Sequence, residues 1–411
     1  MPLAEPRPAG PLDAFIALCG RAAWRGRLAD LGSRTQQGSF SARAAQQRHA
    51  LELTLARLCA PEALARASLA DRRLLGFALE AVRLAKSLPA APRARLREEL
   101  AAGLTGQATL IPLFHLLRTA ARLRGHGFTV SLAGLAEGAA HDLLIEHDGA
   151  TAEVVCETVS AEEGRPLHRG DWCAMVDRIN PELQTWLAAH PGRYLLKMTL
   201  PEDIADPAAL AQLQGRISGL LAAEKRQDSG GQAVLKLDPL VLAGAQAADR
   251  PWGRPGDQGD DRANGLPARL RAQFGPEAHL AVTTCAGSGS VFVMAARATR
   301  GNEIAAAVCR RLALAAERRL SGTQPGILAV FLEDLDRGEW LGLRDQLELE
   351  GAVRRFLTTL PAKRVVAVSC TSRFEMFGAA DAAPEGELRF RNQAHPAARV
   401  AALAPAVVSF V

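Results

Sequence analysis

The sequence predicts a mixed α/β protein with a helical N-terminal region, an α-β-β-β-α-β core and an additional C-terminal α/β region. Three observations lead to this prediction. Apolar residues recur every three or four positions through the first hundred residues, as they do on one face of a helix. From Gly106 onward, short strand-like apolar runs alternate with further helical patterns. Clusters of glycine and proline separate these periodic segments.

Residues 1–105 are predicted to form a basic helical region. Residues 1–100 contain 16 Arg and Lys against 9 Asp and Glu, a balance of +7, whereas the rest of the chain has a balance of −2. If bulk charge binds a polyanion, this region does so, although a solvated arginine-rich surface explains the charge equally well. The expected helices are Leu12–Leu31, Ala42–Cys59, Pro61–Leu88 and Arg93–Leu100.

Residues 106–205 are predicted to form the core. A helix is followed by three strands, a second helix and a fourth strand, and the turn His147-Asp148-Gly149 joins the second and third strands. The expected helices are Ala108–Arg124 and Asp171–His190, and the expected strands are Phe128–Leu132, Asp142–Glu146, Thr151–Val159 and Tyr194–Leu200.

Residues 206–411 continue as α/β structure, interrupted at 244–267 by a Gly/Pro-rich stretch without periodicity that we interpret as a loop or linker. We expect Glu333, Asp334 and Asp336, which follow a buried strand, to cap or solubilise a loop. The expected helices are Pro207–Arg226, Glu303–Leu320 and Leu343–Leu360, and the expected strands are Ala233–Leu242, His279–Cys285, Ser290–Ala296, Ile327–Leu332 and Arg364–Cys370.

The seven cysteines are dispersed, without a C-x-x-C pair or a histidine at metal-ligand spacing. This pattern favours reduced thiols and argues against a disulfide framework or a zinc site. No signal-peptide pattern opens the sequence, and no apolar run approaches the ~20 residues that span a bilayer. We therefore expect a cytoplasmic protein without a membrane partner.

The stretch 139–169 carries the strongest functional signal. His141-Asp142 opens one hairpin strand, the next strand reads VVCETVS at 154–160, and Gly164-Arg165 and His168-Arg169 follow. With the element order, these residues resemble the PD-(D/E)xK (restriction-endonuclease-like) nucleases, in particular members with the strand V-E-C-K-T-V-S. The resemblance implies a Mg²⁺-dependent phosphodiesterase acting on nucleic acid, DNA more than RNA, with carboxylates holding the metal.

The active-site motif is degenerate. In this alignment Asp142 matches the first acid, but Val155 stands where the second acid belongs and Glu157 where the lysine belongs. Glu153 and Glu157 lie on one strand face ~13 Å apart, too far to share one ion. A metal site would therefore combine Asp142 with Glu157, with Glu153 in reserve.

Three hypotheses remain open on the sequence alone. In the first, Asp142 and Glu157 bind Mg²⁺ and cut nucleic acid, while Arg165, His168 and Arg169 contact phosphate. In the second, the fold is kept without catalysis, as a nucleic-acid-binding or protein-assembly module. In the third, the resemblance is accidental and Asp142 and Glu157 do not converge. The residues also have plain structural alternatives.

Those alternatives place Asp142 as a cap at a strand start, and Glu153 and Glu157 as exposed residues or partners of Arg165 or Arg169. An unpaired Glu157 between apolar neighbours on a central strand would be costly, which favours a site or a buried ion pair. We further expect a homodimer or a protein partner to use the N-terminal helices.

Overall fold

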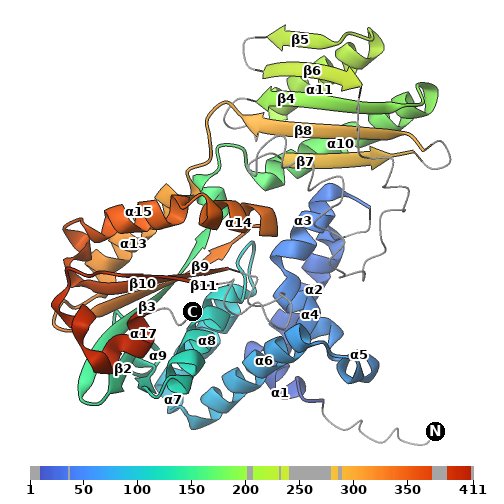
Figure 1. Ribbon diagram of the computed structural model, residues 1–411. Coiled ribbons are helices and arrows are strands. Elements are labelled where there is room, and N and C mark those ends of the chain that lie inside the picture. The colour runs from blue at the N-terminus through green and yellow to red at the C-terminus, as the bar shows by residue number, and fades with distance from the viewer. Residues whose placement is uncertain are drawn as a thin grey trace, which may run out of the picture.

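The structure is a computed structural model that describes residues 10–35, 38–200, 207–230, 233–239, 279–285, 289–372 and 387–408. These residues form a group of N-terminal helices and two mixed sheets with helices packed on them, which confirms the α/β class (Figure 1). The predicted Gly/Pro-rich loop at 244–267 lies outside them. None of the described helices combines the length and apolar content needed to cross a membrane.

The N-terminal helices share a core with the six-stranded sheet. A chain of edge-to-face aromatic contacts runs from Phe15 through Phe77 and Phe114 to Phe331, with ring centroids 5.6–6.5 Å apart. Such pairs add to the burial of their apolar area, so the helices form one body with the sheet. The helices are α1 (Asp13–Cys19), α2 (Arg21–Arg34), α3 (Phe40–Arg48), α4 (Ala50–Arg57), α5 (Pro61–Ala65), α6 (Leu69–Ser87) and α7 (Ala90–Gly103).

The six-stranded sheet has the order β1-β2-β3-β9-β10-β11, in which β3, β9 and β10 are parallel neighbours. The hairpin between β2 and β3 turns at Asp148 and Gly149, both with positive φ, as predicted for an Asp-Gly turn. The strands are β1 (Thr129–Ser131), β2 (Leu143–His147), β3 (Ala150–Ser160), β9 (Gly326–Glu333), β10 (Val365–Ser372) and β11 (Glu387–Arg391).

Helices cover both faces of this sheet. Side chains alternate along β3, so Val154 packs with α8 (Ile111–Gly125) while Val155 packs with α13 (Ile304–Arg319). A helix predicted at Leu343–Leu360 is instead two helices, α14 (Arg337–Asp345) and α15 (Glu348–Leu357), separated at Leu347, whose φ is 58°. The remaining elements are α9 (Ala133–Glu137), α17 (Ala404–Val407) and short 3₁₀ turns at Ala161–Gly164, Pro361–Arg364, Pro396–Arg399 and Ala401–Leu403.

The second sheet has the order β5-β6-β4-β8-β7 and carries α10 and α11 on one face (Figure 1). It meets the N-terminal helices at α3, where the carboxylate of Asp177 accepts the backbone N–H groups of Phe40 and Ser41 at 2.6 and 2.9 Å. Its elements are α10 (Arg169–Ala189), β4 (Arg193–Leu200), α11 (Pro207–Ala222), β5 (Gln227–Gly230), β6 (Ala233–Pro239), β7 (His279–Thr284) and β8 (Val291–Ala298).

This topology corrects the predicted core. The helix and strand expected to complete it, α10 and β4, belong to the second sheet, where β4 pairs with β6 and β8. The strand that lies beside β3 is β9, and the helix preceding it is α13. Apart from the short helix α9 between β1 and β2, the predicted α-β-β-β-α-β order along the chain is correct. Strand pairing, however, is a non-local property that local periodicity does not reveal.

Candidate functional site

Asp142 lies immediately before β2 and is fixed to the neighbouring strand. Its backbone N–H donates to the carbonyl of Val154 at 3.0 Å, and its Oδ2 accepts the backbone N–H of Cys156 at 2.7 Å. The β2–β3 hairpin thus holds Asp142, the first residue of the predicted acid pair, in place.

Glu157 and Asp142 converge on one cation, Arg319 at the end of α13. The Arg319 guanidinium donates to Oδ1 of Asp142 at 2.7 Å and to Oε1 of Glu157 at 2.8 Å. The side chains of Asp142 and Glu157 are 19% and 15% exposed, and that of Arg319 is 30% exposed. The site is therefore a half-buried triad that joins strand β3 to helix α13.

Burial of the triad disfavours the charged forms of its side chains. Burial raises the pKa of Asp142, and Glu157 raises it further, while Arg319 and the Cys156 N–H act in the opposite direction. Burial likewise raises the pKa of Glu99 on α7, and Asp142 adds to that rise. With Glu99 near Asp142 as well as Glu157, the acids outnumber the single arginine, so the site carries more negative than positive charge.

Glu153 does not join Asp142 and Glu157. It is 3% exposed, and its carboxylate accepts the backbone N–H of Ser321 at 2.8 Å and the Ser321 hydroxyl at 2.5 Å. It therefore fixes the turn between α13 and β9. Glu153 and Glu157 therefore contact different partners and do not form one site.

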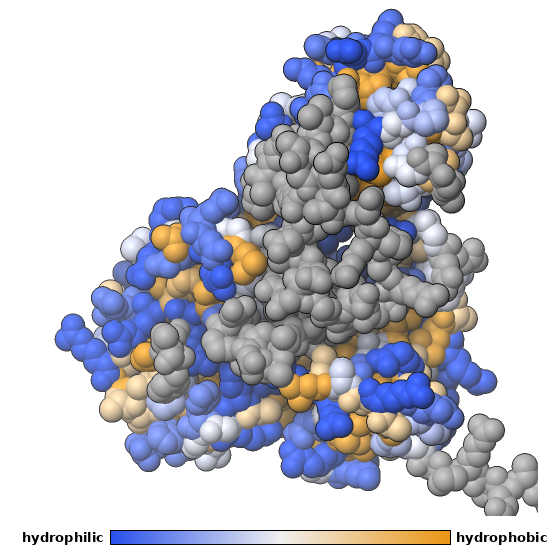
Figure 2. All heavy atoms as spheres, turned by 45° about the vertical axis from the view of Figure 1, so that its right-hand side comes forward, coloured by the Kyte–Doolittle hydropathy of each residue, from blue (hydrophilic) through white to orange (hydrophobic). Residues whose placement is uncertain are grey.

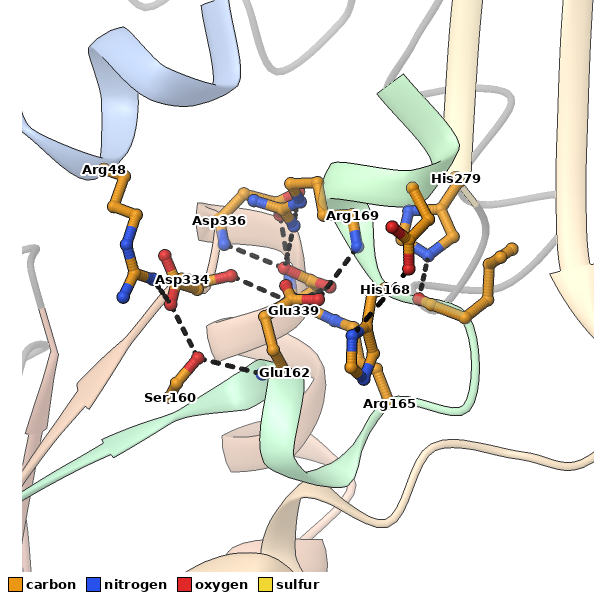
Figure 3. Close-up of polar contacts among 12 residues, drawn as sticks. Arg48, Ser160, Glu162, Arg165, His168, Arg169, His279, Asp334, Asp336 and Glu339 are labelled. Carbon is orange, nitrogen blue, oxygen red and sulfur yellow. Dashed lines mark hydrogen bonds and ion pairs between the residues drawn. The ribbon is translucent and has the colours of Figure 1, made fainter. Parts of the chain in front are cut away.

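Arg165 and Arg169, predicted to contact phosphate, instead form a second network of ion pairs (Figure 3). Arg165 has no exposed side-chain area and pairs with Glu162 and, at 2.5 Å, with Glu339 of α14. Arg169 pairs with Glu339 at 2.7 Å and lies 3.6 Å from Asp336. Arg165 is thus out of reach of a nucleic acid, and Arg169 is neutralised by acids of α14.

His168 is the predicted phosphate contact that remains at the surface. Its side chain is 56% exposed, and its Nδ1 lies 3.9 Å from Oδ2 of Asp171. By contrast, His279 from the second sheet is buried, has its Nε2 2.9 Å from the carbonyl oxygen of Leu167, and has a pKa lowered by burial to about 3. The buried histidine is a neutral structural group.

The acids after β9 do more than solubilise a loop. Asp336 caps α14 in a capping box with Glu339, at a helix start that the sequence did not predict. Asp334, at φ 59°, accepts from Ser160 at 2.6 Å and pairs with Arg48 of α3. Glu333 has a pKa raised to about 7, by burial and by the adjacent Asp334. These contacts join the N-terminal helices to the carboxyl ends of β3 and β9 (Figure 3).

The donor set at Asp142 and Glu157 does not fit a Mg²⁺ site. A magnesium ion requires near-octahedral oxygen ligands, whereas here two carboxylates already bind a guanidinium and Val155 is fully buried in an apolar cluster. Among the described residues, no group of three or more His, Cys, Asp or Glu side chains has a metal-binding arrangement. Arg319 supplies one positive charge to two carboxylates and already occupies Oδ1 of Asp142 and Oε1 of Glu157, so a cation at this site would have to displace it.

Arg319 is the site residue that sequence reasoning does not find. The signal for it is Glu157 itself, which requires a partner, but Arg165 and Arg169 are the arginines nearest in sequence and therefore the partners expected. No protein-family model, no curated protein and no solved structure matches the chain.

Proposed function

We propose that the chain is a nucleic-acid-acting protein with a restriction-endonuclease-like core in which Arg319 takes the place of a metal ion, so that it binds nucleic acid without cutting it. The observation that carries the proposal is the convergence of Asp142 and Glu157 on Arg319. An accidental resemblance gives no reason for Asp142 and Glu157 to meet, yet both reach the same guanidinium.

The order of elements supports this core. Along the chain, α8, β1, β2, β3, α13 and β9 follow the α-β-β-β-α-β order, and β9 lies parallel beside β3. The second sheet, at 193–298, is inserted between β3 and α13. In this arrangement α13 and β9 take the places that the sequence assigned to α10 and β4.

The chemistry of the triad favours binding over hydrolysis. Metal-assisted hydrolysis requires carboxylates that are free to hold a cation, and here displacing Arg319 would break two short charged hydrogen bonds. Val155 adds no ligand. The hypothesis of Mg²⁺-dependent cleavage through Asp142 and Glu157 is therefore the alternative outcome of the test below.

The N-terminal helices offer the phosphate-binding charge. Some of their arginines are used internally, such as Arg27, which is buried and donates to the carbonyls of Gly106 and Ala108. Others are exposed, namely Arg21, Arg25, Arg66 and Arg72. Figure 2 shows hydrophilic residues interspersed with hydrophobic ones over the lower part of the molecule. Exposed arginines bind phosphates by releasing counterions, independently of sequence.

Binding is tested by fluorescence anisotropy of a labelled DNA duplex in EDTA over a series of salt concentrations. We expect affinity to fall as salt rises. In the fourfold variant Arg21→Gln/Arg25→Gln/Arg66→Gln/Arg72→Gln, the log–log slope should shrink by about 0.9 for each phosphate that the variant no longer neutralises. The same assay on RNA is expected to give weaker binding.

The matched control is Arg193→Gln/Arg297→Gln/Arg318→Gln/Arg354→Gln, which removes four exposed arginines outside the N-terminal helices and is expected to leave the slope unchanged. The duplex is also incubated with Mg²⁺ or Mn²⁺. Cleavage that disappears in both Asp142→Ala and Glu157→Ala would replace the proposal with an active nuclease. Absence of both binding and cleavage at low salt would overturn the binding proposal and the nuclease alternative alike.

A further inference from the structure

A surface groove of about 890 Å³ runs between α13 and α15. These two helices lie side by side on the face of the six-stranded sheet opposite α8 (Figure 1). Small or apolar side chains line much of the groove: Ala305, Ala306, Cys309, Ala313, Ala352 and Phe356. Two neighbouring helices with a small-residue face of this kind allow further helices to approach closely.

Charges are ordered along the groove. Each wall carries a glutamate at its beginning and an arginine seven residues later, Glu303 and Arg310 on α13, and Glu348 and Arg355 on α15. Seven residues are two helical turns, about 10 Å. Because α13 and α15 lead into the parallel neighbours β9 and β10, both helices run in the same direction. The glutamates therefore share one end of the groove, and the arginines lie together farther along.

Large apolar side chains are exposed at the ends of α15. Leu347 lines the groove beside the glutamates and is 60% exposed, and Leu360, just beyond the last turn, is 72% exposed. Between them, Gly351 occupies the position on α15 that Ala306 occupies on α13, three residues after the glutamate. Small residues therefore line the middle of the groove, leucines project at the ends of α15, and charges of both signs lie along the groove.

We propose that this groove is the interface between two copies of the chain related by a two-fold axis. In such a contact residue i meets residue j while j meets i, so a surface must be complementary to itself. Equal numbers of acids and arginines, separated along one axis, satisfy this requirement when the second copy lies antiparallel. The Glu303/Glu348 end of each copy then meets the Arg310/Arg355 end of the other.

The antiparallel arrangement also removes apolar area from water. Leu347 of each copy enters the groove of the other, which favours association through the hydrophobic effect. The interface is separate from the N-terminal helices, where the sequence suggested a contact, and from the triad of Asp142, Glu157 and Arg319. The inference is therefore independent of nucleic-acid binding.

Sedimentation equilibrium of the full chain over a range of concentrations tests the proposal. We expect wild type to reach the mass of two chains. Two charge-reversed proteins are compared with it, the acidic Arg310→Glu/Arg355→Glu and the basic Glu303→Arg/Glu348→Arg. Each places like charges at both ends, so its dimer dissociation constant should rise by at least about tenfold. An equal mixture of the two should recover the dimer, because opposite charges meet again.

The control is Arg66→Glu/Arg72→Glu, which makes the same charge change as the acidic protein at exposed N-terminal positions and should dimerise like wild type. Far-UV circular dichroism verifies that each variant is folded. A wild type that stays monomeric throughout would overturn the proposal. So would dimerisation unaffected by both reversals, or abolished in the control alone. Two folded variants that fail to recover the dimer on mixing would overturn the antiparallel contact.

Discussion

Replacing Arg319 with methionine should destabilise the protein, and do so more at neutral than at acidic pH. Methionine keeps the length and apolar stem of the side chain but removes the cation between Asp142 and Glu157. Two carboxylates are then left close together, half-buried and without their partner. Removing one side of a buried ion pair leaves uncompensated charge, which costs more than the pair itself contributes.

The magnitude follows from the exposure of the triad. An exposed ion pair contributes under about 1 kcal/mol, whereas loss of a partner from a buried pair costs about 3–5 kcal/mol. With Arg319 30% exposed and its partners 19% and 15% exposed, we expect the free energy of unfolding to fall by about 2–4 kcal/mol near pH 7.

The pH dependence has a definite sign. Burial raises the folded-state pKa of Asp142 above its ordinary value of 3.8, and loss of Arg319 raises it further. A carboxyl with a raised folded-state pKa favours folding most below its unfolded-state pKa, and this contribution is lost as pH rises through the folded-state pKa. The difference between Arg319→Met and wild type should therefore shrink as pH falls toward about 4.

Urea unfolding followed by far-UV circular dichroism at several pH values measures this difference. The adjacent Arg318 is exposed, so Arg318→Met is the matched control and should change stability by less than about 0.5 kcal/mol. Combining Arg319→Met with Asp142→Asn and Glu157→Gln should recover part of the loss, because the two side chains that lose their partner are then neutral. Equal effects of the Arg318 and Arg319 variants, or a deficit that grows on acidification, would refute the reasoning.

Three other predictions concern buried charges outside the triad. Glu153→Gln weakens the acceptor for the Ser321 N–H and hydroxyl, so the free energy of unfolding should fall by about 1–2 kcal/mol. Amide hydrogen exchange in the turn after α13 should become faster. Unchanged exchange there would contradict the prediction. Arg165→Met leaves Glu162 and Glu339 without one of their partners and should cost about 3–5 kcal/mol. Arg165→Lys keeps the positive charge and should cost less, and thermal unfolding compares the two. Burial and Asp334 raise the folded-state pKa of Glu333 from 4.5 to about 7, so its contribution to stability is lost as pH rises through this range. Glu333→Gln should therefore flatten the plot of urea midpoint against pH between these values. A plot that the substitution leaves unaltered would contradict the prediction.

Local structure is largely predictable from this sequence, whereas the assembly of the sheets is not. The Asp148-Gly149 hairpin and the buried strand at 327–332 both appear where periodicity and turn chemistry place them. The error lies in assigning the strand at 194–200 to the first sheet, because neighbours in sequence are assumed to be neighbours in space. The boundaries of an inserted sheet are not visible in the sequence, because its strands have the same apolar patterns as the strands before and after it.

The same reasoning explains the outcome at the site. The rise of a strand, about 3.3 Å per residue, explains why Glu153 and Glu157 contact different partners although they share a face. The cost of burying a carboxylate correctly requires a partner for Glu157. The partner, Arg319, lies 162 residues away in sequence, and only the packing of α13 on β3 brings it there. The break at Leu347 is equally hidden, because a leucine with positive φ gives no signal in sequence.

The most direct test of the central claim is one reaction resolved on two gels. The full chain is incubated with an end-labelled DNA duplex and Mg²⁺, then run on native and on denaturing gels. We expect a retarded complex on the native gel and full-length strands on the denaturing gel. Shortened strands that form only with metal, and that are absent with Asp142→Ala, would contradict the claim that Arg319 replaces the metal.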